Sequence, residues 1–186
     1  MGNYLYLTAS LPSFPPEGPA PYSPEEFLFH CQGVLDAGDL ADLKAVLEGR
    51  PEEGKCAFCA AWASVEAQIR NAVAKARGTK LGVEAKPFLH AHAGYRVWLD
   101  KDVADALAKG NPLEREIALD GVRRRALDDL AREDGSGLGA VLAFGAQLRL
   151  ASRWGAMTEE AGRAKLDSLV DALEKNASAS GATDFN

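Results

Sequence analysis

The stretch LGAVLAFGAQLRLASRW, residues 138–154, decides the fold that the sequence predicts. Its first ten residues carry no charge, so a helix built from them is apolar on every side. Helices of that kind lie in the centre of a protein rather than on its surface. We therefore expect residues 138–154 to form the central, most buried helix, with Gly139 and Gly145 allowing a neighbouring helix to come close.

The first long helix is marked by its start signal. Ser23 and Glu26 have the spacing of a capping box, and Pro24 stands at the first helical position, where its missing N–H costs nothing. We expect this helix to end at Gly38. Its predicted core face consists of Phe27, Cys31, Val34 and Leu35.

The same kind of signal recurs twice later in the chain. Asn111 can cap a helix that starts with Pro112 and has Glu114 in its first turn, which predicts a helix up to Glu133. Thr158 is predicted to cap the last helix. The predicted core stripe of that last helix consists of Leu166, Leu169, Val170 and Leu173.

Periodic apolar residues predict two more helices between these signals. A short one ends at Gly49–Pro51, and its apolar side consists of Leu40, Leu43, Val46 and Leu47. A longer one is predicted from about Glu52 to Ala76, with Gly78 ending it. Its apolar positions are Phe58, Trp62, Val65, Ile69 and Val73.

Residues 79–99 are the least regular part of the sequence. Tyr95, Val97 and Leu99 recur at every second position, which is compatible with a short strand. A further short helix is expected to open at Asp100 or Asp102 and to end at Gly110.

The sequence as a whole predicts an all-α, single-domain bundle of six or seven helices, because no alternating strand–helix pattern is present. We expect the helical domain to span residues 1–175. Within it, residues 3–22 hold a tyrosine-containing start and an extended connector, since six of the nine prolines fall between Pro12 and Pro24. Residues 176–186 are small and polar, which predicts a flexible tail.

The charge distribution argues against a nucleic-acid partner. The net charge is -6 at pH 7, whereas a phosphate backbone is bound by a cationic surface. Residues 1–60 hold nine acids and three bases, and the rest of the chain holds eighteen of each. The acidic first third is suited to steering a basic protein partner.

The sequence also bears on the compartment. No basic segment precedes an apolar run at the start, so we expect no signal peptide. No stretch approaches the ~20 apolar residues of a bilayer-spanning helix, and we expect no membrane insertion. Three cysteines in such a chain fit a reducing compartment. We therefore expect a cytoplasmic protein.

Cys56 and Cys59 form a C-x-x-C pair, the one motif in the sequence that is typical of metal binding or redox chemistry. In thioredoxin-like proteins such a pair starts a helix after a strand, and no strand–helix alternation surrounds this one. A zinc site needs two more ligands, and the candidates are His30 with Cys31 or His90 with His92. The first two are adjacent on a helix and point in different directions. We expect two small buried side chains without metal or cofactor, and keep a metal-binding or redox protein as the alternative.

Two polar ladders follow the predicted helices. Trp62, Glu66 and Arg70 recur every four residues beside Asn71, and the later ladder consists of Glu116, Asp120 and Arg124. If the two helix edges face each other, their charges pair in a partly buried network that fixes helix register. The adjacent run Arg123–Arg125 is expected to be a solvated face paired with nearby acids.

No pattern typical of an active site is present. The sequence lacks G-x-S-x-G, Walker A, Rossmann and H-E-x-x-H motifs, so we expect a protein that is not an enzyme. Such a protein acts by presenting a rigid surface to other proteins. The residues expected to matter for structure or interaction are Tyr4, Tyr6, Trp62, Glu66, Arg70, Asn71, Glu114 and Asp120.

Short segments spread over residues 3–173 resemble a bacterial family of mostly helical proteins of uncharacterised function, encoded among the subunits of V-type ATP synthases. The segments are Tyr4–Pro12, Ile69–Asn71, Asn111–Glu114, Leu119–Asp120, Leu148–Trp154 and Glu159–Gly162. The opening also resembles that of the C subunit, the helical part that couples the central rotor shaft to the membrane ring, although this chain is much shorter. The resemblance implies a cytoplasmic accessory or central-stalk subunit that reaches the inner membrane through its ATPase partners.

The tyrosine-rich opening has two readings. In the C subunit the matching tyrosines begin a helix, which the resemblance implies for Tyr4 and Tyr6 as well. The alternative is a short extended segment laid across the helical core. Under both readings we expect the two rings to be largely buried, with bonded hydroxyls.

Overall fold

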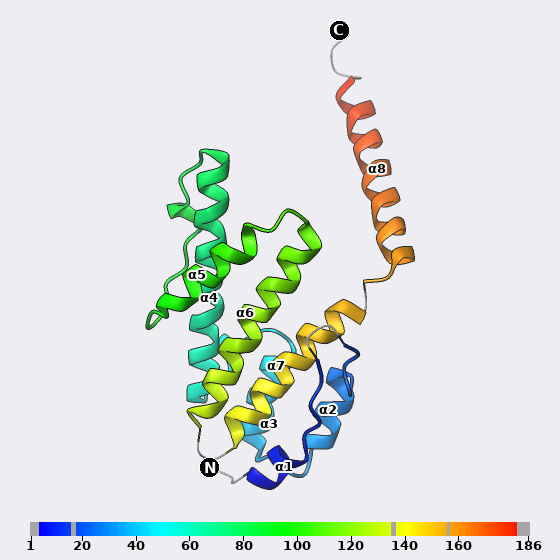
Figure 1. The fold of residues 1–186 in the computed structure, drawn as a ribbon. Coiled ribbons are helices and arrows are strands. Elements are labelled where there is room, and N and C mark those ends of the chain that lie inside the picture. Colours follow the sequence, from blue (N-terminus) through cyan, green and yellow to red (C-terminus); the bar gives the residue numbers. More distant parts are fainter. Residues whose placement is uncertain (1–3, 16–17, 135–136, 156, 182–186) are drawn as a thin grey trace. The chain divides into compact units, whose positions relative to one another are not determined.

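The computed structural model describes residues 4–15, 18–134, 137–155 and 157–181. Within them it contains eight α-helices, two short 3₁₀ helices and no strand, which confirms the predicted all-α class (Figure 1). The chain divides into two compact units, Met1–Ser152 and Arg153–Asn186. The elements are α1 (Leu5–Ser10), α2 (Pro24–Cys31), α3 (Ala37–Leu47), η1 (Pro51–Glu53), α4 (Ala57–Leu81), η2 (Lys86–Phe88), α5 (Val97–Leu107), α6 (Pro112–Arg132), α7 (Leu138–Gly155) and α8 (Glu159–Gly181).

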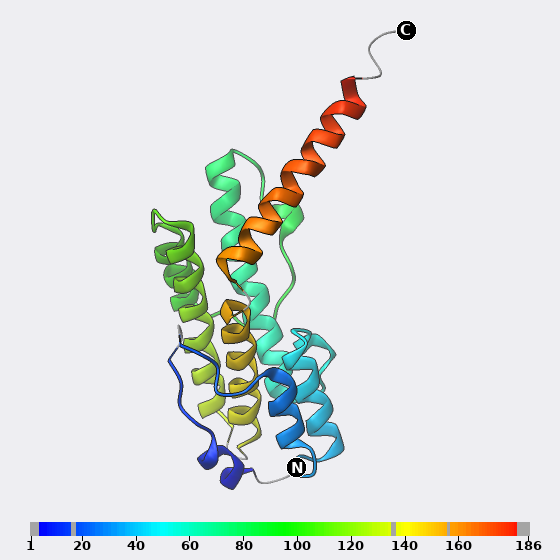
Figure 2. The ribbon, with the colours of Figure 1, turned by 90° about the vertical axis from the view of Figure 1, so that its right-hand side faces the viewer.

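The central position predicted for residues 138–154 is confirmed. Eleven of the eighteen residues of α7 are buried. Figures 1 and 2 show α7, in yellow, surrounded by α2, α3 and α6. Neither α7 nor any other helix within the described residues is long and apolar enough to cross a membrane.

Close packing around α7 depends on a glycine. A Cβ added to Gly145 would lie 2.8 Å from Cδ1 of the buried Leu43 on α3, so Leu43 packs against α7 in the space that the glycine leaves. Beside it, the ring centroid of Phe144 lies 4.9 Å from that of Phe27 on α2. The prediction that Gly145 permits a close neighbour is therefore confirmed.

The start of α2 is as predicted, but its end is not. The Ser23 hydroxyl accepts the Glu26 N–H at 3.1 Å, and the Glu26 carboxylate accepts the Ser23 N–H at 2.8 Å. The helix ends at Cys31 rather than at Gly38, because Gly33 adopts a φ of 82° and turns the chain. Val34, predicted to face the core, is consequently exposed.

The caps of the two later helices are confirmed. The Asn111 side chain accepts the Leu113 N–H at 2.9 Å at the start of α6. The Thr158 hydroxyl accepts the Ala161 N–H at 3.2 Å at the start of α8. These signals are readable from sequence because cap and first turn are adjacent in the chain.

Helix α4 begins and ends later than predicted. Its expected first turn is replaced by η1 (Pro51–Glu53). At the other end Gly82 adopts a φ of 67°, the left-handed conformation that ends many helices. Gly78, the predicted end, lies inside the helix, where a Cβ would approach the Val83 carbonyl oxygen to 2.7 Å. Its role is therefore close packing rather than termination.

The strand predicted around residues 95–99 is wrong, since α5 begins at Val97. The backbone ahead of α5 bonds to two side-chain amides of α4 instead of to another strand. Asn71 donates to the His90 carbonyl and accepts the His90 N–H, both at 2.8 Å. The Gln68 amide likewise donates to the Arg96 carbonyl at 2.9 Å and accepts the Arg96 N–H at 3.0 Å. These two amides fasten residues 90–96 to α4.

The second unit contains α8, which continues to Gly181 and so includes part of the predicted tail. Every described side chain from residue 157 to residue 173 is exposed. This unit provides no core for the stripe that was predicted to face one, because none of its described residues covers that stripe. Its exposed fractions are 61% for Leu166, 51% for Leu169, 44% for Val170 and 68% for Leu173.

Candidate functional site

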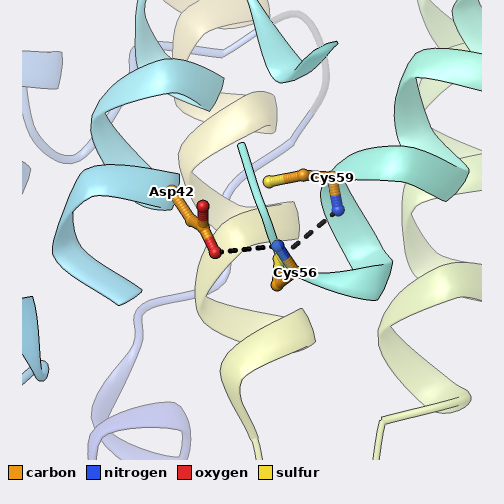
Figure 3. A group of neighbouring side chains, drawn as sticks. All are labelled: Asp42, Cys56 and Cys59. Carbon is orange, nitrogen blue, oxygen red and sulfur yellow. Dashed lines mark hydrogen bonds between the residues drawn. The ribbon is translucent and has the colours of Figure 1, made fainter. Parts of the chain in front are cut away.

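Cys56, Cys59 and Asp42 form a cluster at the start of α4. Their side-chain oxygen and sulfur atoms all lie within 4.8 Å of one another (Figure 3). Cys56 is the N-cap residue of α4, and Cys59 is in the first turn of that helix. Asp42 comes from the buried side of α3 and is only 5% exposed. The pair therefore does start a helix, as in redox proteins, although the described residues before it contain no strand.

Backbone hydrogen bonds fix the geometry of this cluster. The Asp42 carboxylate accepts the N–H groups of Lys55 at 2.6 Å and of Cys56 at 3.1 Å. The sulfur of Cys56 accepts the Cys59 N–H at 3.4 Å. Asp42 thus holds the end of the loop that leads into α4, and Cys56 caps the helix (Figure 3).

The two thiols differ in acidity. The hydrogen bond from the Cys59 thiol lowers the pKa of Cys56, and the Cys59 backbone N–H lowers it further; burial and the Asp42 carboxylate oppose them without prevailing. The same thiol–thiol hydrogen bond, with burial second, raises the pKa of Cys59. Cys56 is therefore the thiol that ionises first.

A pocket of about 280 Å³ opens beside Cys56. Its walls come from the starts of α4 and α7 and the end of α6, and they are largely apolar. The lining residues are Cys56, Ala57, Phe58, Ala61, Leu130, Glu133, Asp134, Leu138 and Gly139. Cys56 is half-buried at this pocket, whereas Cys59 is completely buried behind it.

The cluster does not fit a structural zinc site. Such sites use four protein ligands, whereas the described residues bring together only three candidate groups here. The histidines considered from the sequence lie elsewhere. His30 is exposed and contacts the Tyr22 ring, and the His92 ring lies 3.0 Å from the Gly94 carbonyl. Asp42 was not predicted from the sequence, where its only signal is an acid among the apolar residues of α3.

The two tyrosines of the opening have different environments. Tyr4 is 5% exposed, and its hydroxyl is hydrogen-bonded at the start of α3, as predicted. Tyr6 is 91% exposed, so the expectation that its ring is buried is wrong. The reason is the short helix α1 (Leu5–Ser10), which directs residues two apart to different sides, whereas an extended segment would direct them to the same side.

The two helix edges do face each other, but the ion pairs between them run through Arg123, which belongs to neither ladder. Arg123 is only 16% exposed, so the expectation that it lies on a solvated face is wrong. Arg123 donates to Glu66 on α4 at 2.9 Å and to Asp120 at 3.0 Å. Arg70 lies 4.0 Å from Glu66 and is mostly exposed. Arg124 donates instead to the Phe14 carbonyl at 3.0 Å, so it holds the proline-rich connector against α6.

Burial would lower the pKa of Arg123, but Glu66 and Asp120 outweigh it, so the pKa is raised. The side chain stays charged and joins α4 to α6. Two further predicted residues lie apart from this network: Trp62 is buried in the core, and Glu114 is exposed in the first turn of α6.

The chain matches no protein-family model, no curated protein and no solved structure. Its function has to be inferred from its own geometry and from the sequence resemblance. The geometry offers two features: the thiol cluster of unit Met1–Ser152 and the exposed apolar stripe of α8.

Proposed function

We propose that the chain is a non-catalytic subunit of a bacterial V-type ATPase, in an accessory or central-stalk position with a coupling role like that of the C subunit. The resemblance of its segments over residues 3–173 supports this proposal. The acidic first third supports it as well, because it favours a basic protein surface as partner. In this role the protein works in the cytoplasm and reaches the membrane only through its partners.

The exposed stripe of α8 is the observation that carries the proposal. Leu166, Leu169 and Leu173 recur at spacings of three and four, the spacing of a seam between two helices. Val170 widens the stripe on the same side. Four large apolar side chains on one helix face, each 44–68% exposed, favour burial against another protein. In this proposal, a helix of a stalk subunit covers the stripe.

The test is purification of the tagged full-length chain from cells that encode the ATPase. A double variant, Leu169→Glu with Leu173→Glu, introduces two charges into the stripe. Ala164→Glu with Ser168→Glu is the matched control, because it adds the same charges at the same four-residue spacing on the opposite side of α8.

We expect the wild type and the control pair to co-purify with ATPase subunits. The amount of ATPase subunits recovered with the stripe pair should be at least about tenfold lower. Circular dichroism checks that both pairs retain helix content. Purification of the wild type without any ATPase subunit would refute the proposal. Equal recovery by both pairs would show that α8 is not the contact.

A further inference from the structure

The two thiols of the cluster occupy special positions on α4. Cys56 is the N-cap and Cys59 is the third helical residue, the positions that a serine and a glutamate occupy in a capping box. The free N–H groups and the dipole of the first turn favour negative charge at these positions. Both sulfur atoms lie there, within 4.8 Å of each other.

The surroundings make the pair asymmetric. Cys56 faces the pocket and is within reach of a small molecule. Cys59 is 0% exposed, and a Cβ on Gly54 would approach its sulfur to 2.4 Å, so the loop closes tightly over it. With the pKa of Cys56 lowered and that of Cys59 raised, Cys56 is the accessible and more acidic thiol, and Cys59 is the less acidic thiol behind it.

We propose that Cys56 and Cys59 form a reversible dithiol–disulfide couple that exchanges with a small disulfide bound in the neighbouring pocket. Cys56 is the attacking sulfur, and Cys59 resolves the mixed disulfide. Two acids also line the pocket, and both have partners in the protein: Glu133 lies 3.5 Å from the Arg96 guanidinium, and Asp134 accepts the Gly139 N–H. This activity is independent of the assembly role proposed above.

The exchange balances in two steps. The Cys56 thiolate attacks one sulfur of the small disulfide, forming a mixed disulfide and releasing the other half as a thiolate, which takes a proton from water. Cys59 then loses its proton and attacks the Cys56 sulfur, forming the internal disulfide and releasing the second thiol. One small disulfide is reduced to two thiols as the protein dithiol is oxidised.

Asp42 positions this couple. Its carboxylate accepts the Cys56 N–H and lies within 4.8 Å of both sulfur atoms, so it fixes the start of α4 on which the pair is carried. The internal disulfide needs the two sulfurs to approach to about 2.05 Å from within 4.8 Å, so the proposed couple requires both side chains to rotate towards each other.

The experiment uses the reduced full-length chain and cystamine, a disulfide with two amines. After acid quenching and alkylation, peptide masses locate each thiol, mixed disulfide and internal disulfide. Cys59→Ser traps the mixed disulfide at Cys56, and Cys56→Ser tests whether Cys59 reacts alone. Cys31→Ala is the control, because Cys31 is buried on α2 away from the pair.

We expect an internal Cys56–Cys59 disulfide in the wild type and in the Cys31→Ala control. In the Cys59→Ser variant the amine adduct should form on Cys56 and remain there. Its rate of formation should be at least about tenfold higher than the rate at which Cys59 is modified in Cys56→Ser. Free thiols in a natively helical chain after excess cystamine would overturn the proposal, as would preferential adduct at Cys59. One tightly bound zinc per chain that blocks alkylation of both thiols would overturn it in favour of a metal site.

Discussion

The Tyr4 hydroxyl donates a 2.7 Å hydrogen bond to the Asp39 carboxylate in the first turn of α3. The same hydroxyl accepts the Asp36 N–H at 3.1 Å. Asp36 is the N-cap of α3 but makes no side-chain cap of its own, so Tyr4 satisfies a backbone group that the helix leaves open. The start of the chain is thereby tied to the bundle.

Tyr4→Phe is expected to destabilise the protein by about 1–2 kcal/mol, because the ring stays while Asp36 and Asp39 lose their buried partner. Urea denaturation followed by circular dichroism measures this. Tyr6→Phe is the control and should change the free energy of unfolding by less than about 0.5 kcal/mol, since Tyr6 is exposed. Equal effects of the two substitutions would contradict the anchoring role of Tyr4.

Arg123→Met is expected to cost about 3 kcal/mol, because it leaves the carboxylates of Glu66 and Asp120 without their shared cation in a site with little solvent. Arg70→Met is the matched control. Its side chain is 63% exposed, and its loss should cost less than about 0.5 kcal/mol. A loss at Arg70 as large as that at Arg123 would show that the network is not centred on Arg123.

Asn71→Ala is expected to release the segment ahead of α5 without unfolding the bundle, because both hydrogen bonds to His90 come from the Asn71 amide. Hydrogen exchange in peptides that cover residues 86–96 should become at least about tenfold faster. Thr79→Ala is the control, since Thr79 bonds only within α4, to the Lys75 carbonyl. Unchanged exchange in Asn71→Ala would refute the fastening role.

Cys31 predicts an alkaline loss of stability. Burial raises the pKa of its thiol to about 11, above the value of an exposed thiol near 8.5. The folded state therefore retains the proton longer than the unfolded state, so this contribution is complete below about pH 8.5 and falls as the pH rises towards 11.

Urea denaturation at pH 8 and pH 10.5 checks this dependence. The wild type should lose more stability between the two values than Cys31→Ala, by about 2 kcal/mol. The substitution itself lowers stability at both values, so only the difference between them is informative. The same pH dependence in both proteins would contradict the assignment to Cys31.

Local signals in the sequence predicted local structure well. The caps at Ser23 and Asn111 involve residues within one helical turn. The burial of α7 could be predicted from its own uncharged sequence, without knowledge of the helices that pack on it. Choices between near-equivalent residues were not predictable. Arg123 and Arg124 point about 100° apart on α6, and the packing of that helix decides which one meets Glu66.

Features that depend on distant contacts were missed for the same reason. The sequence around Gln68 is that of a surface residue, and its burial depends on the contact with residues 90–96, which are distant in the chain. The sequence gives Asp42 the features of a solvated acid, and its burial depends on the contact between α3 and the loop before α4. The stripe of α8 reveals that an apolar face exists but does not identify what covers it.

The central proposal is that this chain is an accessory or central-stalk subunit of a V-type ATPase. Its most direct test is purification of the ATPase through a tag on a catalytic subunit, followed by quantitative mass spectrometry of the intact complex. The account predicts that this chain is present in a fixed molar ratio to the catalytic subunits and remains through a second purification step. Its absence from an active, intact complex in cells that produce both would contradict the account.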